Sequence, residues 1–152
     1  MKSKKLNLLV TNIFKKHGLS NQHAKISSSA LINAELVGAY GHGLSRLKMY
    51  CDRILKKVIN PKPKIKIKKV SQSIYHIDAN NSIGFVAADL AIKTAIKSAK
   101  KTGIGMVAVK NSGHYGLSGY YAEQAVKKNL ITMIYTNAPP AVAPHGALKT
   151  LF

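Results

Sequence analysis

The fold of this chain is decided by residues 104–116, which are Ile104-Gly105-Met106-Val107-Ala108-Val109-Lys110-Asn111-Ser112-Gly113-His114-Tyr115-Gly116. Residues 104–109 form a continuous apolar run of strand length, and this predicts an internal strand covered on both faces. The run is followed by a loop over 111–116, in which two glycines flank His114. Ligands of open α/β sheets bind outside the carboxyl ends of the strands. The stretch therefore predicts an α/β protein with a ligand site on this loop.

The residues on either side of this stretch continue the α/β pattern. A long helix is predicted over 85–102, ended by Gly103. Its predicted buried stripe consists of Ala88, Ala91, Ile92, Ala95, Ile96 and Ala99. Beyond the loop we expect a helix over 117–129 with Tyr121 and Ala125 facing inwards, and a second buried strand over 130–136. Two buried strands make a poor sheet alone, so we expect the segment to be part of a larger one.

The N-terminal third has a helical pattern instead. Apolar spacing predicts helices over 6–14, over 20–38 with Ser20 as N-cap, and over 47–58. Pro61 and Pro63 mark a connection. Strand-like runs follow at 64–70, predicted as a half-exposed strand with a solvated face, and at 73–78, and Asn80-Asn81-Ser82 is predicted as a turn. We therefore divide the chain into a helical lobe, 1–60, and the first part of an α/β domain, 61–152.

Composition limits the classes of function. The 152 residues carry a formal net charge of +19, almost all from lysine, with arginine only at Arg46 and Arg53. Specific nucleic-acid readers use arginine for bidentate contacts, and AT-rich coding is enough to explain abundant Lys, Ile and Asn. We therefore expect no nucleic-acid partner, although a basic anion-binding module remains an alternative. The single cysteine, Cys51, is predicted to be a buried thiol in a reducing cytoplasm. No apolar run is long enough to span a membrane.

Two further segments could contribute to chemistry. In Gly41-His42-Gly43-Leu44-Ser45-Arg46, an imidazole and a guanidinium lie four residues apart and could bind a carboxylate at a helix start. The alternative is a glycine-rich connection with a surface arginine. Asn137, at the end of the predicted strand 130–136, could contact a substrate or a nicotinamide carboxamide, but a strand-ending turn is favoured. His114 could act as a general acid/base, or could cap the following helix. No cluster with metal-ligand spacing occurs in the sequence.

Taken together, these segments resemble the malate/L-lactate dehydrogenase family that does not use a Rossmann fold. That group includes ureidoglycolate, sulfolactate and diketogulonate enzymes and cyclic-imino-acid reductases. The resemblance covers nearly the whole chain. The matching segments are Ala34–Val37, Gly41–Leu47, Gly84–Ala87, Val107–Gly116, Thr136–Pro139, Ala143–Gly146 and Leu151.

The resemblance implies a three-layer α/β/α fold with a mixed sheet, a homodimer, NAD or NADP as cofactor, and a small anionic 2-hydroxyacid or 2-oxoacid as substrate. It implies that His114 is the acid/base. It also implies that His42, Ser45 and Arg46 contact the substrate. The cofactor contacts that it implies are Tyr115, Asn137 and Pro144.

This chain departs from the family pattern at two residues and in its length. Gly41 replaces a serine that usually precedes the first histidine, and His145 replaces an aromatic residue. Family chains are more than twice as long and continue with a Gly-Thr-Asn-Pro segment. We therefore expect a truncated or split dehydrogenase, with a catalytically inactive fragment as the alternative.

Overall fold

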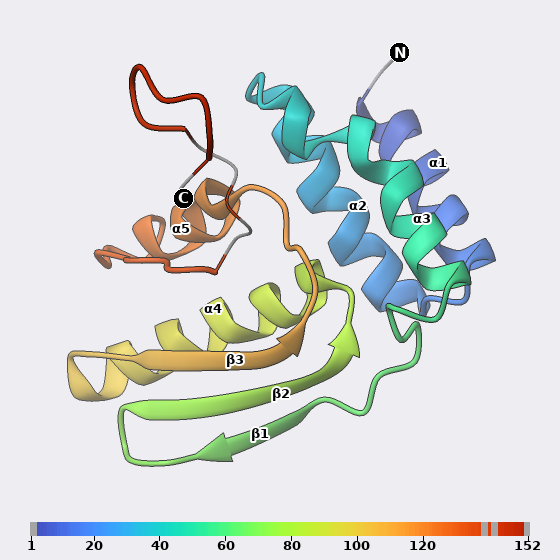
Figure 1. The fold of residues 1–152 in the computed structure, drawn as a ribbon. Coiled ribbons are helices and arrows are strands. Elements are labelled where there is room, and N and C mark those ends of the chain that lie inside the picture. Colours follow the sequence, from blue (N-terminus) through green and yellow to red (C-terminus); the bar gives the residue numbers. More distant parts are fainter. Residues whose placement is uncertain (1–2, 138–139, 141–142, 151–152) are drawn as a thin grey trace.

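The computed structural model describes residues 3–137, 140 and 143–150, and Figure 1 shows its helices and strands. The N-terminal part contains three helices and two short 3₁₀ turns. The C-terminal part alternates strands and helices. In chain order the elements are α1 (Ser3–Lys16), α2 (Asn21–Leu36), η1 (Tyr40–His42), η2 (Leu44–Arg46), α3 (Leu47–Leu55), β1 (Lys66–Lys69), β2 (Ile74–Ser82), α4 (Gly84–Thr102), β3 (Met106–Ser112) and α5 (Ser118–Val126).

The three predicted N-terminal helices are present and enclose the main core. Ser20 caps α2, because its hydroxyl accepts the backbone N–H of His23 at 3.1 Å and so satisfies a donor that the first turn leaves free. Phe14 of α1, Leu31 of α2 and Phe85 of α4 are all fully buried in one apolar cluster. The start of α4 is therefore packed inside the helical lobe, which connects the lobe to the sheet.

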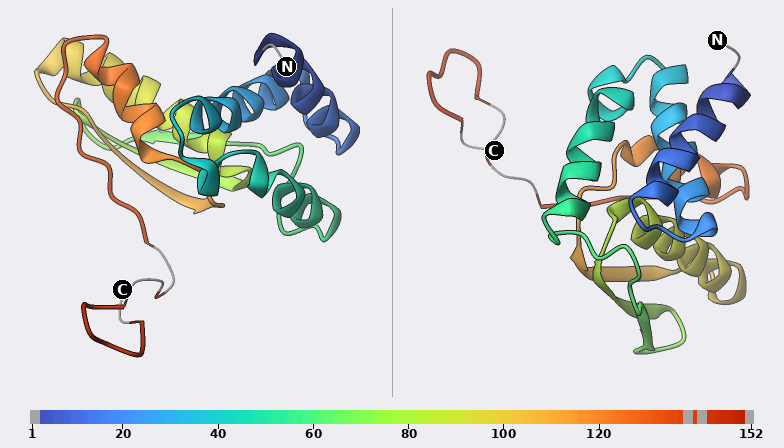
Figure 2. Two further views of the ribbon diagram at one scale, coloured as in Figure 1. Left: turned by 90° about the horizontal axis from the view of Figure 1, so that it is seen from above. Right: turned by 90° about the vertical axis from the view of Figure 1, so that its right-hand side faces the viewer.

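The sheet is mixed and has the order β1-β2-β3. β1 pairs antiparallel with β2, with Ile67 opposite Ile77, and β2 pairs parallel with β3, with His76 opposite Ala108. The crossover between the two parallel strands is α4, which lies along one face of the sheet (Figure 2). The α/β class with a mixed sheet and a helical lobe is thus confirmed. Of the three expected layers, the described residues supply the sheet and the helices on one side of it.

The prediction of an internal strand at 104–109, covered on both faces, is wrong. β3 begins at Met106, extends through Ser112 into the predicted loop, and is an edge strand of the described sheet. Met106 keeps 58% of its surface exposed. An apolar run indicates what a strand could bury, but burial requires a neighbouring strand and a covering layer, and no described strand pairs with the outer edge of β3.

The predicted buried strand at 130–136 is also not found. This segment has no regular secondary structure, and Ile131 is 96% exposed. A strand gains its backbone hydrogen bonds only from a partner. Ala138 and Pro139, the last two residues of the matching segment Thr136–Pro139, lie outside the described residues.

Three smaller expectations need correction. Asn80-Asn81-Ser82 lies inside β2 instead of forming a turn: both asparagines have positive φ, and the pairing with β3 is irregular before it resumes at Ser82. The lysine-rich strand β1 is exposed on both faces. Of the predicted stripe on α4, only Ile92 is buried, because α5 and the sheet cover the other five residues only in part.

Other expectations are confirmed. Tyr121 and Ala125 of α5 face inwards, and both are buried. Cys51 is buried, and burial raises the pKa of its thiol, as expected for an inert structural cysteine. None of the described helices combines the length and the apolar character needed to cross a bilayer.

Candidate active site

His114 lies on the loop of residues 113–117, which connects β3 to α5. The loop sits directly on the first turn of α4, since a Cβ on Gly84 would collide with the carbonyl groups of Gly113 and His114. Gly116 has a φ of +80°, and a Cβ there would lie 2.7 Å from the Phe85 ring. Glycine at these two positions therefore allows the loop to approach α4 closely, and this approach fixes the position of the imidazole.

The Nδ1 atom of His114 makes two hydrogen bonds. It lies 2.6 Å from the hydroxyl oxygen of Tyr50 and 3.2 Å from the backbone nitrogen of Gly116. A backbone N–H can only donate, so Nδ1 must be the acceptor and the neutral ring carries its proton on Nε2. No hydrogen bond within the described part of the chain involves Nε2. The nitrogen that carries the proton is therefore also the one available to a ligand.

Cationic groups surround this imidazole. The rings of His42 and His114 are stacked, with centroids 5.9 Å apart and planes inclined by 19°. Burial, followed by the positive charges of His42, Arg46 and Arg53, holds the pKa of His114 below its ordinary value. A negatively charged ligand would reduce this repulsion, so the arrangement suits an anion.

The segment 40–46 brings His42 to this position from the helical lobe. Its two 3₁₀ turns are fastened by Glu35, whose Oε1 accepts the backbone N–H of Leu44 at 2.6 Å. A Cβ on Gly43 would collide with the same carboxylate. Glu35 was not singled out by the sequence, because its partner is a backbone amide in a segment without regular periodicity.

Ser45 and Arg46 both bond within their own segment. The Ser45 hydroxyl donates to the Tyr40 carbonyl at 2.6 Å, and the Arg46 Nε donates to the Gly41 carbonyl at 2.8 Å. The latter bond leaves the terminal guanidinium nitrogens of Arg46 available for a carboxylate. The structure thus brings His42 and Arg46 close to His114, while the Ser45 hydroxyl holds the backbone.

Tyr50 is a site residue that sequence reasoning missed. Its side chain is fully buried against Phe85, with ring centroids 4.7 Å apart, and burial raises the pKa of its phenol above the ordinary value. The helical spacing of α3 indicated only that Tyr50 faces the core. Its partner His114 is 64 positions further along the chain, so no local pattern could have indicated the contact.

The three residues expected to bind the cofactor do not gather around His114. Tyr115 packs on Tyr121, with its hydroxyl 3.0 Å from that of Ser118. Asn137 is exposed, and residues 143–150, which include Pro144, extend away from the folded body (Figure 2). In the described ranges, then, the residues present do not form a cradle for a nicotinamide dinucleotide.

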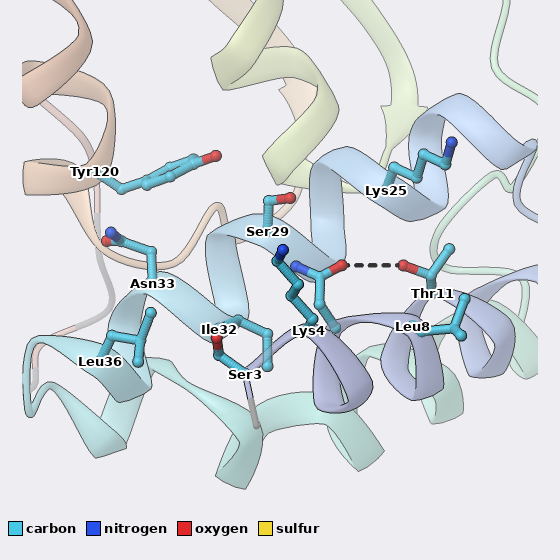
Figure 3. A pocket seen from close by; sticks show the side chains of 11 residues that line it. Ser3, Lys4, Leu8, Thr11, Lys25, Ser29, Ile32, Asn33, Leu36 and Tyr120 are labelled. Atoms are coloured by element: carbon cyan, nitrogen blue, oxygen red, sulfur yellow. Dashed lines mark hydrogen bonds between the residues drawn. The ribbon is translucent and has the colours of Figure 1, made fainter. Parts of the chain in front are cut away.

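Other features that could support chemistry, namely a surface hollow and the acidic residues, lie away from His114. A hollow between α1, α2 and α5 is lined by side chains such as Lys4, Asn33 and Tyr120 (Figure 3), and His114 is not part of it. Among the described residues, no group of three His, Cys, Asp or Glu could hold a metal ion. Each acidic residue makes a structural contact away from the imidazole; the five are Glu35, Asp52, Asp78, Asp89 and Glu123. Acid–base chemistry at this site therefore depends on histidine.

The α/β scaffold presents a protonated imidazole nitrogen within the influence of a guanidinium, an arrangement whose chemistry suits proton exchange with a small anion. Comparison with known proteins makes this chemistry specific. The family described as malate/L-lactate dehydrogenase matches residues 1–152, and the chain belongs to this family.

The chain is similar to proteins more than twice its length. It is 43% identical over 142 residues to the malate dehydrogenase of Pyrococcus abyssi. The aligned region covers 93% of this chain and 39% of that protein. In structure it resembles the sulfolactate dehydrogenase of Methanocaldococcus jannaschii, with a TM-score of 0.82 and 36% identity over 85% of this chain and 38% of the other. The chain therefore spans about two fifths of the length of these relatives.

The names of two further relatives state which cofactor each of those relatives uses. The ureidoglycolate dehydrogenase (NAD(+)) of Escherichia coli is 29% identical over 97% of this chain and 42% of its own length. The (2R)-3-sulfolactate dehydrogenase (NADP(+)) of Chromohalobacter salexigens is 31% identical over 89% of this chain and 40% of its own length. Relatives of this chain thus include both NAD- and NADP-dependent dehydrogenases.

Proposed function

We propose that this chain supplies the substrate and proton-transfer part of a dehydrogenase that moves a hydride between NAD or NADP and a small 2-hydroxyacid or 2-oxoacid. The observation that supports this most directly is the environment of His114. Two donors occupy Nδ1, so the proton sits on Nε2, which is free to meet a ligand. A carbonyl oxygen of a 2-oxoacid is an acceptor that fits such a donor.

Each residue of the site has a task in this reaction. The terminal nitrogens of Arg46, with His42 beside them, bind the carboxylate of the substrate. His114 exchanges a proton with the oxygen on the neighbouring carbon. In reduction the protonated ring gives its Nε2 proton to the carbonyl oxygen, and in oxidation a ring that carries its proton on Nδ1 takes up the hydroxyl proton at Nε2. Ser45 shapes the segment 40–46 through its bond to the Tyr40 carbonyl. In the relatives named above, the hydride comes from or goes to a nicotinamide.

The cofactor contacts remain part of the proposal. We propose that Tyr115, Asn137 and Pro144 lie near the dinucleotide in the assembled protein. Asn137 is exposed in the described chain, so its amide is available to such a contact. The choice between NAD and NADP is open, since relatives of both kinds exist.

The test is turnover by the native protein that contains this chain, expressed from its complete reading frame. Oxidation of NADH and of NADPH is followed with a panel of 2-oxoacids, dicarboxylic and sulfonated acids included. We expect turnover with at least one of them, and a loss of about 10²–10⁴-fold in kcat for His114→Ala. His76→Ala is the matched control, because His76 is an exposed histidine on β2. Absence of turnover, or a His114→Ala variant as fast as the wild type, would contradict the proposal.

A second variant tests the carboxylate contact. Arg46→Lys keeps the positive charge but removes the planar pair of donors. We expect KM for the 2-oxoacid to rise at least tenfold, with a smaller change in kcat. Unchanged KM would remove Arg46 from the substrate site.

We also propose a homodimer in the cytoplasm and a division into units 1–60 and 61–152. The buried thiol of Cys51 is compatible with a reducing compartment, and the homodimer is what the family resemblance implies. Sedimentation of the native protein tests the dimer. Limited proteolysis between Asn60 and Lys64 tests the division.

A further inference from the structure

The two donors on His114 Nδ1 differ in what they can do when the ring takes up a second proton. A protonated imidazole carries N–H groups at both nitrogens. The Gly116 amide can only donate, so it cannot bond to an Nδ1–H. The Tyr50 hydroxyl can rotate and accept it, because a phenol is both donor and acceptor.

Tyr50 is held in place for this exchange. Its ring is fully buried against Phe85, and its oxygen lies 2.6 Å from Nδ1. Burial also keeps its phenol protonated at neutral pH, since it raises the pKa of that group. Movement of one hydrogen atom is thus enough to reverse the direction of the bond, and no heavy atom has to move.

The remaining neighbours of the ring cannot replace Tyr50. The groups whose charges reach His114 are His42 on η1, Arg46 on η2 and Arg53 on α3, all of them cationic or able to become so. In the described part of the chain, no carboxylate is hydrogen-bonded to the imidazole. The phenol oxygen of Tyr50 is therefore the available acceptor for an Nδ1–H.

We propose that Tyr50 is a positioning residue whose hydroxyl donates to neutral His114, so that the exchangeable proton is on Nε2, and reverses to accept from Nδ1–H when the ring becomes protonated. This inference rests on the proposed function for its catalytic meaning. In reduction of a 2-oxoacid, the protonated ring gives its Nε2 proton to the carbonyl oxygen as the hydride arrives from NADH or NADPH. The Nδ1 proton stays on the ring, bonded to Tyr50, until a proton from solvent restores Nε2–H.

The direct test is nitrogen NMR of the imidazole in the ¹⁵N-histidine-labelled chain. At a pH where the ring is neutral, we expect an unprotonated Nδ1 and a protonated Nε2. The opposite tautomer would overturn the proposal without the use of any variant. This readout does not depend on turnover.

The second arm is Tyr50→Phe, with Tyr121→Phe as the matched control. Each substitution removes one buried tyrosine hydroxyl bonded to the same loop, but Tyr121 donates to the Tyr115 carbonyl at 2.8 Å and not to the imidazole. Tyr50→Phe removes a bond to both forms of His114. The bond to the charged form is the stronger, so we expect the pKa of His114 to fall by about one unit, a tenfold loss of proton affinity.

The two variants separate this role from simple packing. Tyr121→Phe is expected to leave the His114 titration where it is in the wild type. An unchanged titration in folded Tyr50→Phe, or an equal shift in both variants, would overturn the proposal. If Tyr50→Phe does not fold, the tautomer of the His114 ring in the wild type still tests the proposal.

Failure of the proposed function gives a different result. In the active native protein, the pH profile for oxoacid reduction should move to lower pH in Tyr50→Phe by the same amount as the titration. A shifted titration in a protein without turnover would support the role of Tyr50 at His114 and reject the dehydrogenase. If Tyr50→Phe leaves the His114 titration unchanged in a protein with turnover, the role of Tyr50 is rejected and the dehydrogenase is supported.

Discussion

The loop at 113–117 and the segment at 130–137 both contain apolar side chains, but among the described residues only the loop is hydrogen-bonded to buried side chains of neighbouring helices. The loop packs against α3, α4 and α5, so that its conformation is fixed by contacts with the buried residues Tyr50, Gly84 and Tyr121. The segment is richer in apolar residues than the loop, yet Ile131 is almost fully exposed. Apolar sequence identifies what could be buried, but the neighbours available decide whether it is.

The largest expected difference between the two regions is in core truncation. Phe85→Ala removes a fully buried ring that packs on Tyr50, and we expect it to lower the free energy of unfolding by about 3–5 kcal/mol. Ile131→Ala should change it by less than about 0.5 kcal/mol. Urea unfolding followed by circular dichroism measures both. Equal effects would mean that the segment at 130–137 is packed in solution.

A matched pair of glycines gives the next largest difference. Gly116 and Gly146 have nearly the same positive φ, +80° and +78°, but a Cβ meets the Phe85 ring at Gly116 and nothing within 4 Å at Gly146. Alanine is strained at both positions. Only Gly116→Ala adds overpacking, with an expected cost of about 1–3 kcal/mol more than Gly146→Ala. Unfolding free energies that agree within error would contradict the close approach of the loop to Phe85.

Two tyrosine hydroxyls provide a smaller contrast. Tyr121→Phe leaves the Tyr115 carbonyl without its buried donor, so we expect a loss of about 1 kcal/mol. Tyr135→Phe removes a hydroxyl from a side chain that is 85% exposed, and we expect no measurable loss. A larger effect for Tyr135→Phe would assign a buried partner to the segment at 130–137.

The smallest expected effect is on the pH dependence of stability. The pKa of His114 in the folded chain is lowered, first by burial, so the unfolded chain binds more protons just below the ordinary histidine pKa of about 6.5. Stability should therefore fall as the pH drops from neutral through that range. His114→Asn should flatten this decline. Identical acid slopes for the wild type and the variant would show that the ring is not buried in this way in solution.

Much of the fold could be predicted because its signals are local. The hydroxyl of Ser20 caps its own helix, and the spacing of Tyr121 and Ala125 shows directly which face of α5 is buried. His114 could also be recognised from local sequence, because it lies between two glycines on the loop that follows a predicted strand. Local rules failed at residues 80–82, where asparagines with turn-like backbone angles interrupt a strand that continues beyond them.

The two site residues that sequence analysis missed, Tyr50 and Glu35, could not have been predicted from residue spacing. Tyr50 reaches His114 from a different helix, and Glu35 reaches Leu44 across a turn. Both side chains have ordinary helical positions in the sequence. Only the tertiary arrangement shows that Tyr50 is hydrogen-bonded to the imidazole of His114 and that Glu35 fastens the segment that carries His42.

Among the described residues, no strand pairs with the outer edge of β3, and this has a consequence for the handling of this chain. An open strand edge favours association between copies, while a net charge of +19 keeps them apart by long-range repulsion. That repulsion acts over about 10 Å at 0.1 M salt and about 3 Å at 1 M salt. Colloidal stability should therefore decrease as ionic strength rises, so that dilute buffers keep this chain dispersed and concentrated salt brings the edges together.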